Sequence, residues 1–287
     1  MRDHGVTNLG QRLAELVGAE PLDWTPRAGG YSTAERYTVT LDDGRRVFVK
    51  TAEAEHMAAW LRREHEVYGS LQGRFIPRLI GFDDHGGRPL LVIEDLSHAD
   101  WTPRWTSDRV ALVRASLDEL HACPAPPNTH PVRETYATWF DRWRIVETDP
   151  EPFLSLGLRS RAWLAERLPA LIDAADAAPV DGDAVTHLDV RSDNLCTLEG
   201  RAIFVDWNFV SFAAPELDLA AWACSLALEG GPPPWTLLPD SPGFAAFISG
   251  IFAAVAGLPP PETAPSVREF QARQLAVALD WLDHDLS

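Results

Sequence analysis

Residues 187–206 contain the stretch that decides the fold, and they begin with His187-Leu-Asp189-Val-Arg-Ser-Asp-Asn194. In this motif a carboxylate stands five residues before an amide, so one short loop can present both Asp189 and Asn194. The apolar segments on either side of Glu199-Gly200 predict a β-hairpin that ends at Asp206. Carboxylate and amide oxygens suit Mg²⁺, a hard cation that keeps waters and substrate phosphates among its ligands. We therefore expect the hairpin to bring Asp206 back beside Asp189 and Asn194, around a magnesium ion.

The region before this motif has the pattern of a small antiparallel sheet. Strands are predicted over residues 22–27, 35–40 and 46–51, with glycines in the first connection and Asp42-Asp43-Gly44 as a hairpin turn in the second. Helical periodicity over 54–72 and two further strands within 79–95 follow. Together these elements predict a five-stranded antiparallel sheet with one helix.

Lys50 and Glu64 are predicted to form an ion pair within this region. Lys50 is the sole lysine among 25 basic residues, which indicates a position where a compact ammonium is needed and a guanidinium fails. On a helical wheel of residues 54–72, Glu64 lies in the middle of the apolar arc. A carboxylate on a core-facing stripe is costly unless it is paired. Lys50, on the third strand, is the expected partner.

Beyond residue 96 the pattern becomes mostly helical. Helices are predicted over Ser107–His121, with Ser107 as the cap, and over 135–147, 158–176 and the region after Pro215. A short strand pattern returns at 184–206. The chain is therefore expected to be of the α+β class, with a small β-rich lobe over residues 1–95 and a larger helical lobe over 96–287.

Charge and composition narrow the classes of partner. The formal net charge is −17, which disfavours nucleic acid and favours a cationic partner. The three cysteines show no pattern of a disulfide framework or a zinc site. No segment approaches the ~20 apolar residues of a membrane helix, and no apolar core typical of a signal peptide follows Met1. We expect a cytoplasmic protein without a membrane partner, either a monomer or a homodimer.

With these motifs in place, the sequence resembles the aminoglycoside phosphotransferase and choline kinase-like group, which shares the bilobal protein-kinase-like fold. The resemblance implies that Asp189 is the catalytic base and that Asn194 and Asp206 bind Mg²⁺. It also implies that His187 and Asp218 support the catalytic loop, and that Lys50, braced by Glu64, holds the phosphates of ATP or GTP. By the same resemblance, residues 1–95 bind the nucleotide and residues 96–287 carry the catalytic loop and the acceptor.

Further nucleotide contacts are expected from two segments of the first lobe. The loop of residues 29–34 could cover the phosphates, with hydroxyl contacts from Ser32 and Thr33. Backbone groups of Glu94 and Leu96 would read the adenine edge. The sequence departs from the group in having Leu188 where glycine is frequent and Asp206-Trp-Asn without a following glycine.

The resemblance implies transfer of a phosphate to a hydroxyl of a small molecule, with an antibiotic as the leading acceptor and resistance as the outcome. The net charge favours an amine-bearing acceptor. Candidate contacts in the second lobe are Trp139, Asp141, Asp280, Asp283 and Asp285. Two alternatives stay open, a metabolite kinase of the choline or homoserine type and a catalytically inactive nucleotide-binding regulator.

Overall fold

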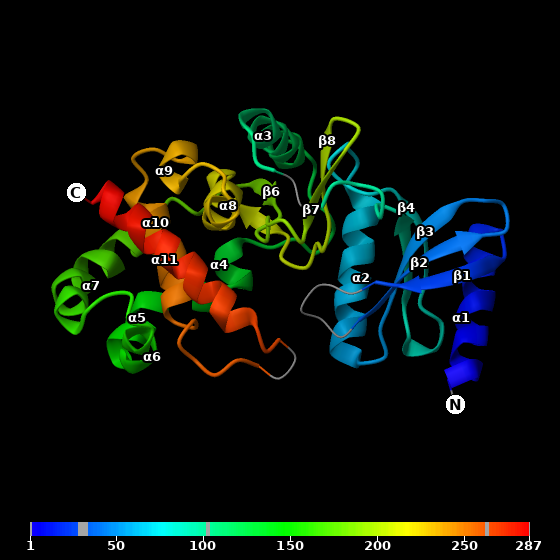
Figure 1. The fold of residues 1–287 in the computed structure, drawn as a ribbon, viewed down its shortest axis with the longest axis horizontal. Coiled ribbons are helices and arrows are strands. Elements are labelled where there is room, and N and C mark those ends of the chain that lie inside the picture. Colours follow the sequence, from blue (N-terminus) through cyan, green and yellow to red (C-terminus); the bar gives the residue numbers. More distant parts are fainter. Residues whose placement is uncertain (1, 28–33, 102–103, 262–263, 287) are drawn as a thin grey trace. The chain divides into compact units, whose positions relative to one another are not determined.

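The computed structural model describes residues 2–27, 34–101, 104–261 and 264–286, and its contacts divide the chain into two compact units (Figure 1). The first unit comprises residues 1–102, 124–127 and 193–208, and the second comprises 103–123, 128–192 and 209–287. The hairpin of residues 193–208 thus packs with the first unit, although it lies about a hundred residues further along the chain. Thr197 and Asp100 exchange backbone hydrogen bonds of 3.0 Å, and Phe204 N donates to Phe75 O at 2.7 Å. The predicted lobe boundary at residue 95 remains a prediction.

A five-stranded antiparallel sheet forms the centre of the first unit, which confirms the predicted sheet. The strand order is β1-β2-β3-β5-β4. The strands are β1 (Pro21–Pro26), β2 (Glu35–Leu41), β3 (Arg46–Thr51), β4 (Leu79–Asp83) and β5 (Leu90–Glu94). A single 3₁₀ turn, η1 (His85–Gly87), connects β4 to β5.

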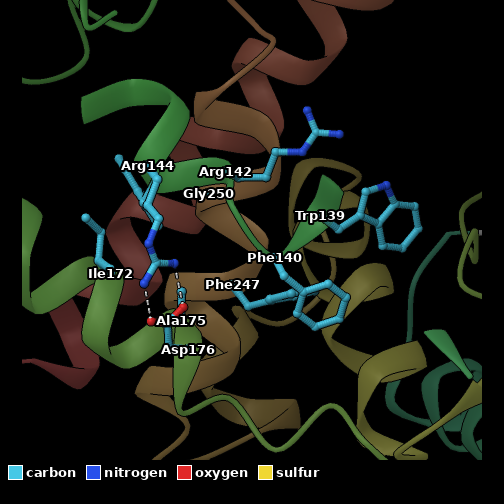
Figure 2. A pocket seen from close by; sticks show the side chains of 10 residues that line it. Trp139, Phe140, Arg142, Arg144, Ile172, Ala175, Asp176, Phe247 and Gly250 are labelled. Carbon is cyan, nitrogen blue, oxygen red and sulfur yellow. Dashed lines mark hydrogen bonds and ion pairs between the residues drawn. The ribbon is translucent and has the colours of Figure 1, made fainter. Parts of the chain in front are cut away.

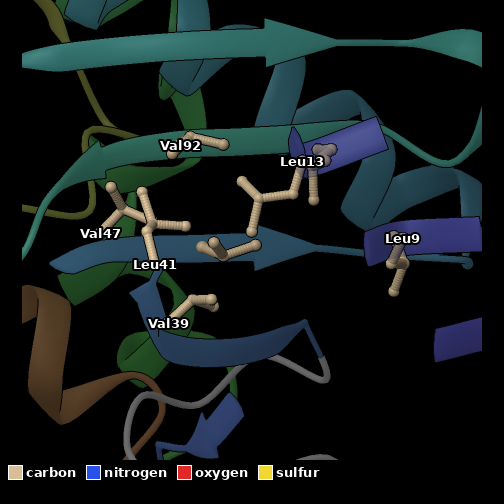
Figure 3. Packing of buried hydrophobic residues seen from close by; sticks show 8 residues of the cluster. Leu9, Leu13, Val39, Leu41, Val47 and Val92 are labelled. Atoms are coloured by element: carbon tan, nitrogen blue, oxygen red, sulfur yellow. The ribbon is translucent and has the colours of Figure 1, made fainter. Parts of the chain in front are cut away.

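Two helices pack on this sheet, so the expectation of one helix was wrong. Helix α2 (Glu55–Ser70) was predicted, whereas α1 (Arg2–Val17) was not. Leu9 and Leu13, four residues apart on α1, belong to one buried apolar cluster with Val47 and Val49 of β3 (Figure 3). Because side chains alternate along a strand, Lys50 points to the opposite face, where α2 lies.

The second unit is mostly helical, as predicted. Its longer helices are α3 (Ser107–His121), α7 (Arg161–Asp176), α8 (Glu216–Leu228), α10 (Pro242–Ala253) and α11 (Val267–Asp285), and its shorter ones are α4 (Val132–Thr135), η2 (Ala137–Trp139), α5 (Arg142–Thr148), α6 (Glu151–Ser155) and α9 (Pro234–Leu237). Thr106, and not Ser107, caps α3, since its side chain accepts a hydrogen bond from Arg109 N. The helix predicted over 135–147 is interrupted, because Tyr136 leaves helical geometry and a new helix begins at Arg142.

Two short sheets complete the molecule. In the first unit β7 (Leu195–Leu198) pairs with β8 (Arg201–Phe204), which is the predicted hairpin. In the second unit β6 (Ala184–Thr186) pairs with β9 (Ser211–Ala213), a strand that the sequence pattern did not indicate. Across the described residues, no helix combines the length and apolar composition that a bilayer crossing requires.

The packing of α1 on the sheet gives a stability prediction. Leu13 is fully buried, so Leu13→Ala removes apolar contacts, leaves a cavity, and is expected to lower the free energy of unfolding by about 2–5 kcal/mol. Leu22→Ala is the matched control, because Leu22 is 69% exposed and should change stability by less than about 0.5 kcal/mol. Urea unfolding followed by circular dichroism measures both. Equal effects of the two substitutions would contradict the packing of α1.

Candidate active site

A buried ion-pair cluster joins three elements of the first unit. Lys50 on β3 forms an ion pair with Glu64 on α2, as predicted, and its Nζ lies 3.1 Å from Oδ1 of Asp206, which follows the β7–β8 hairpin. Lys50 and Glu64 are 6% and 2% exposed. The sole lysine therefore stands between two carboxylates, one from a helix and one from a hairpin.

The ionisation of this cluster follows from burial and from its charges. Burial disfavours the charged form of Lys50, but the carboxylates of Glu64 and Asp206 outweigh it and raise the pKa of Lys50. Burial likewise opposes ionisation of Asp206, but the charge and hydrogen bond of Lys50 outweigh it and lower the pKa of Asp206 to about 2. Burial raises the pKa of Glu64 to about 7 against the opposing charge of Lys50. The cluster thus offers a charged ammonium and an ionised Asp206 at neutral pH.

The hairpin geometry places Asn194 close to Asp206 in the same unit. Val205 N donates to Asn194 O at 2.9 Å, so Asn194 stands opposite the residue that precedes Asp206. Asp206 has a positive φ of 66°, and its Oδ1 accepts a hydrogen bond of 2.6 Å from Nδ2 of Asn208. Glycine often occupies such left-handed positions, whereas here an aspartate adopts the conformation.

The donor set of Asn194 and Asp206 fits a hard divalent cation. Both side chains offer oxygen, and the carboxylate of Asp206 is ionised. Within the described chain, no group of three or more His, Cys, Asp and Glu side chains is gathered for a metal. An ion held by Asn194 and Asp206 would need further ligands, which water and phosphate oxygens can supply.

In the second unit, Asp218 holds the loop that carries Asp189. Asp218 is fully buried in the first turn of α8, where its oxygens accept hydrogen bonds from His187 N at 3.0 Å and from Leu188 N at 2.6 Å. His121, at the end of α3, contacts the same carboxylate at 2.9 Å. Asp189 N in turn donates to Nδ1 of His187 at 3.2 Å. Within the second unit, Asp218 and His187 therefore hold the backbone of the loop that carries Asp189.

Two residues of this arrangement were missed in the sequence. Arg191 places its Nε 3.0 Å from Oδ1 of Asp189. Its position two residues after a candidate base was a usable signal. His121 gave no such signal, because 97 residues separate it from its partner Asp218.

Of the four further residues predicted to contact the nucleotide, the structure describes Glu94 and Leu96. The side chain of Glu94, at the end of β5, pairs with Arg201, and its amide donates to Arg78 O at 2.9 Å. The carbonyl of Leu96 accepts from Ala99 N and from the indole of Trp101. The contacts of Glu94 and Leu96 with the adenine edge stay predictions. Ser32 and Thr33 lie outside the described residues.

The four candidate acceptor carboxylates already have partners. Asp280 and Asp283 both pair with Arg159, at 3.2 and 2.7 Å. Asp285 accepts from Ser241 N and from the indole of Trp281, both at 3.0 Å. Asp141 lies 3.8 Å from Arg144. An amine-bearing acceptor that used Asp280 or Asp283 would therefore have to displace Arg159.

Trp139 lies in an aromatic cluster. Its ring stacks on Tyr136 with 4.4 Å between centroids, and Phe209 lies 6.1 Å away. Trp139 also lines a small pocket between α5, α7 and α10, in which Arg144 reaches Asp176 (Figure 2). Its volume is about 10 Å³, far below the roughly 300–1,000 Å³ of typical ligand pockets. The pocket alone is too small for an antibiotic.

A sheet with a buried Lys–Glu pair, followed by a mostly helical unit with a His-x-Asp loop, defines a protein of the kinase-like fold. The chain belongs to the phosphotransferase enzyme family known as APH, whose family model matches residues 23–240. The predicted family is thus confirmed, together with the predicted enzyme class, a phosphotransferase with an alcohol group as acceptor.

Solved structures support the same fold. The chain is similar to a macrolide 2′-phosphotransferase from Brachybacterium faecium, at 17% identity and a TM-score of 0.60 over 95% of this chain and 98% of that one. It is also similar to an amicoumacin kinase in complex with AMP-PNP and Ca²⁺, at 12% identity and a TM-score of 0.57 over 94% of this chain and 92% of that one. A third similar structure is a choline/ethanolamine kinase family protein from Mesorhizobium loti, with 15% identity and a TM-score of 0.56 over 96% of this chain and 99% of that one. No curated protein sequence matches the chain significantly.

The buried Asp218 gives a second prediction. Asp218→Asn replaces one acceptor oxygen beside His187 N with an NH₂ group and removes the negative charge to which both buried amides donate, which is expected to cost about 2–3 kcal/mol of unfolding free energy. Asp181→Asn is the matched control, since the Asp181 side chain is 66% exposed. Chemical unfolding of both variants provides the test, and a wild-type midpoint for Asp218→Asn would count against this role.

Proposed function

We propose that the protein transfers the γ-phosphate of ATP or GTP to a hydroxyl of a small, amine-bearing antibiotic and so confers resistance. The observation that carries this proposal is the buried cluster of Lys50, Glu64 and Asp206 in a chain of the phosphotransferase family. Kinase catalysis rests on positioning and charge neutralisation, which such a cluster can supply. The protein would act in the cytoplasm, as a monomer or a homodimer.

In the proposed reaction each residue has a separate task. The acceptor oxygen bonds to the γ-phosphorus while the bond from that phosphorus to the β,γ-bridging oxygen breaks, and the hydroxyl proton passes to Asp189. The products are a phosphate monoester and a nucleoside diphosphate. Lys50 would hold the α- and β-phosphates, and Asn194 and Asp206 would hold Mg²⁺. The ion, when bound, offsets the negative charge of the phosphates.

The proposed identity of the acceptor rests on structural likeness and on the net charge. Structures of similar fold include a macrolide phosphotransferase and an amicoumacin kinase, which favours an antibiotic. The net charge of −17 favours an amine. Trp139 could stack on a ring of the acceptor, whereas the candidate carboxylates already pair within the protein.

A metabolite kinase is the second candidate, because a choline/ethanolamine kinase family protein has a similar fold. A catalytically inactive regulator is disfavoured, because Lys50, Glu64, Asp189, Asn194 and Asp206 are all present in the sequence. Phosphorus NMR of reactions with aminoglycosides, macrolides, peptide and nucleoside antibiotics, choline and homoserine separates these functions. A new phosphate-ester resonance with one acceptor class supports that class. Nucleotide binding without any ester would favour the regulator.

Asp189→Asn is expected to fold normally and to lower kcat by at least about 100-fold, because the amide cannot take the hydroxyl proton. Nucleotide affinity should stay near the wild-type value. Release of nucleoside diphosphate in the presence of the acceptor measures turnover, and circular dichroism measures folding. Near-normal turnover would contradict the assignment of Asp189 as the base.

Lys50→Arg is expected to lower kcat/KM for the nucleotide by about 100-fold, because a planar fork cannot replace a buried ammonium between two carboxylates. Arg45→Lys is the matched control, since Arg45 pairs with Asp43 on the exposed surface. Steady-state kinetics with varied nucleotide distinguish the two. Unchanged affinity and rate in Lys50→Arg would count against the assigned role of Lys50.

A further inference from the structure

The backbone around Asp189 is held on its N-terminal side. Asp218 accepts from the amides of His187 and Leu188, and Asp189 N donates to the ring of His187. Leu188 has a positive φ of 62°, a conformation that L-residues seldom adopt and that these hydrogen bonds stabilise. With the backbone fixed in this way, the position of the carboxylate depends on the side-chain torsions of Asp189.

Arg191 contacts that carboxylate from the same loop. Its Nε lies 3.0 Å from Oδ1 of Asp189, and the two side chains are 15% and 26% exposed. By contrast, the ion pair of Arg161 and Glu151 in the same unit has side chains that are 63% and 69% exposed. Exposed pairs contribute little because water and salt screen them, whereas a partly buried pair restricts its members more strongly.

We propose, resting on the function proposed above, that Arg191 is a positioning residue that fixes the rotamer of Asp189 toward the acceptor hydroxyl. Arg191 forms and breaks no bond in this role, and the hydroxyl proton still passes to Asp189. A base displaced by about 1 Å can lose roughly 100-fold in rate, so a contact that fixes its rotamer affects kcat.

The chemistry of the contact explains why arginine suits this position. The contact is an ion pair, in which the charge of a rigid, planar guanidinium lies beside the carboxylate of Asp189. A lysine at position 191 would carry its charge on a mobile ammonium and could hold the carboxylate less firmly. Arg191→Lys should therefore recover only part of the activity that Arg191→Gln loses.

The test compares Arg191→Gln, Arg191→Lys and Arg161→Gln with the wild type in steady-state kinetics. Arg191→Gln is expected to lower kcat by about 30-fold, with a nucleotide KM within about twofold of the wild-type value. The kcat of Arg191→Lys should lie between those of Arg191→Gln and the wild type. The surface control Arg161→Gln should keep the wild-type kcat. If Arg191→Gln folds poorly by circular dichroism, Arg191→Lys carries the same test.

A double-mutant cycle with Asp189→Asn separates positioning from other roles. Once the carboxylate is absent, removal of Arg191 should cause less than about a twofold further loss of residual activity. Multiplicative losses, a raised nucleotide KM or a wild-type kcat in Arg191→Gln would each overturn the proposal. Near-normal turnover of Asp189→Asn alone would instead overturn the proposed function, so the two failures are distinguishable.

Discussion

The buried contact of Lys50 with Glu64 and Asp206 is the interaction on which the first unit depends. It joins a sheet, a helix and a hairpin that are distant in sequence. Removal of one partner from a buried charged group typically costs about 3–5 kcal/mol, because the remaining charge is left uncompensated. The ion pair thus adds to the backbone hydrogen bonds that join the hairpin of residues 193–208 to a unit formed mainly by the first hundred residues. Stability and the proposed phosphate chemistry therefore rest on the same three side chains.

In the second unit, the buried carboxylate of Asp218 organises its surroundings as the Lys50 cluster does in the first unit. It lies in the first turn of α8, where the helix dipole favours a negative charge, and two backbone amides and His121 satisfy its oxygens. These hydrogen bonds hold Leu188 in a left-handed conformation that costs roughly 1–2 kcal/mol for a residue other than glycine. The departure from glycine at this position is thus compatible with a well-formed loop.

The sequence predicted those parts of the fold whose residues follow a local pattern. The hairpin around Glu199-Gly200 and the buried Glu64 could be read from turn chemistry and from helical periodicity. Helix α1 was missed, since its apolar face becomes clear only where Leu9 and Leu13 meet the sheet. His121 was missed because no local pattern indicates a contact across 97 residues. The acceptor contacts of Asp280, Asp283 and Asp285 stay predictions. Their partners Arg159 and Ser241 are distant in sequence, so no local pattern indicated these ion pairs and this hydrogen bond.

The central claim is that the first unit binds the phosphates of a nucleoside triphosphate and Mg²⁺ through Lys50, Asn194 and Asp206. A crystal structure with Mg²⁺ and a non-hydrolysable ATP analogue tests it most directly. The account predicts the ion within about 2.0–2.1 Å of oxygens of Asn194 and Asp206, with Nζ of Lys50 on an α- or β-phosphate oxygen. A nucleotide bound elsewhere, or an ion without contact to Asp206, would contradict it.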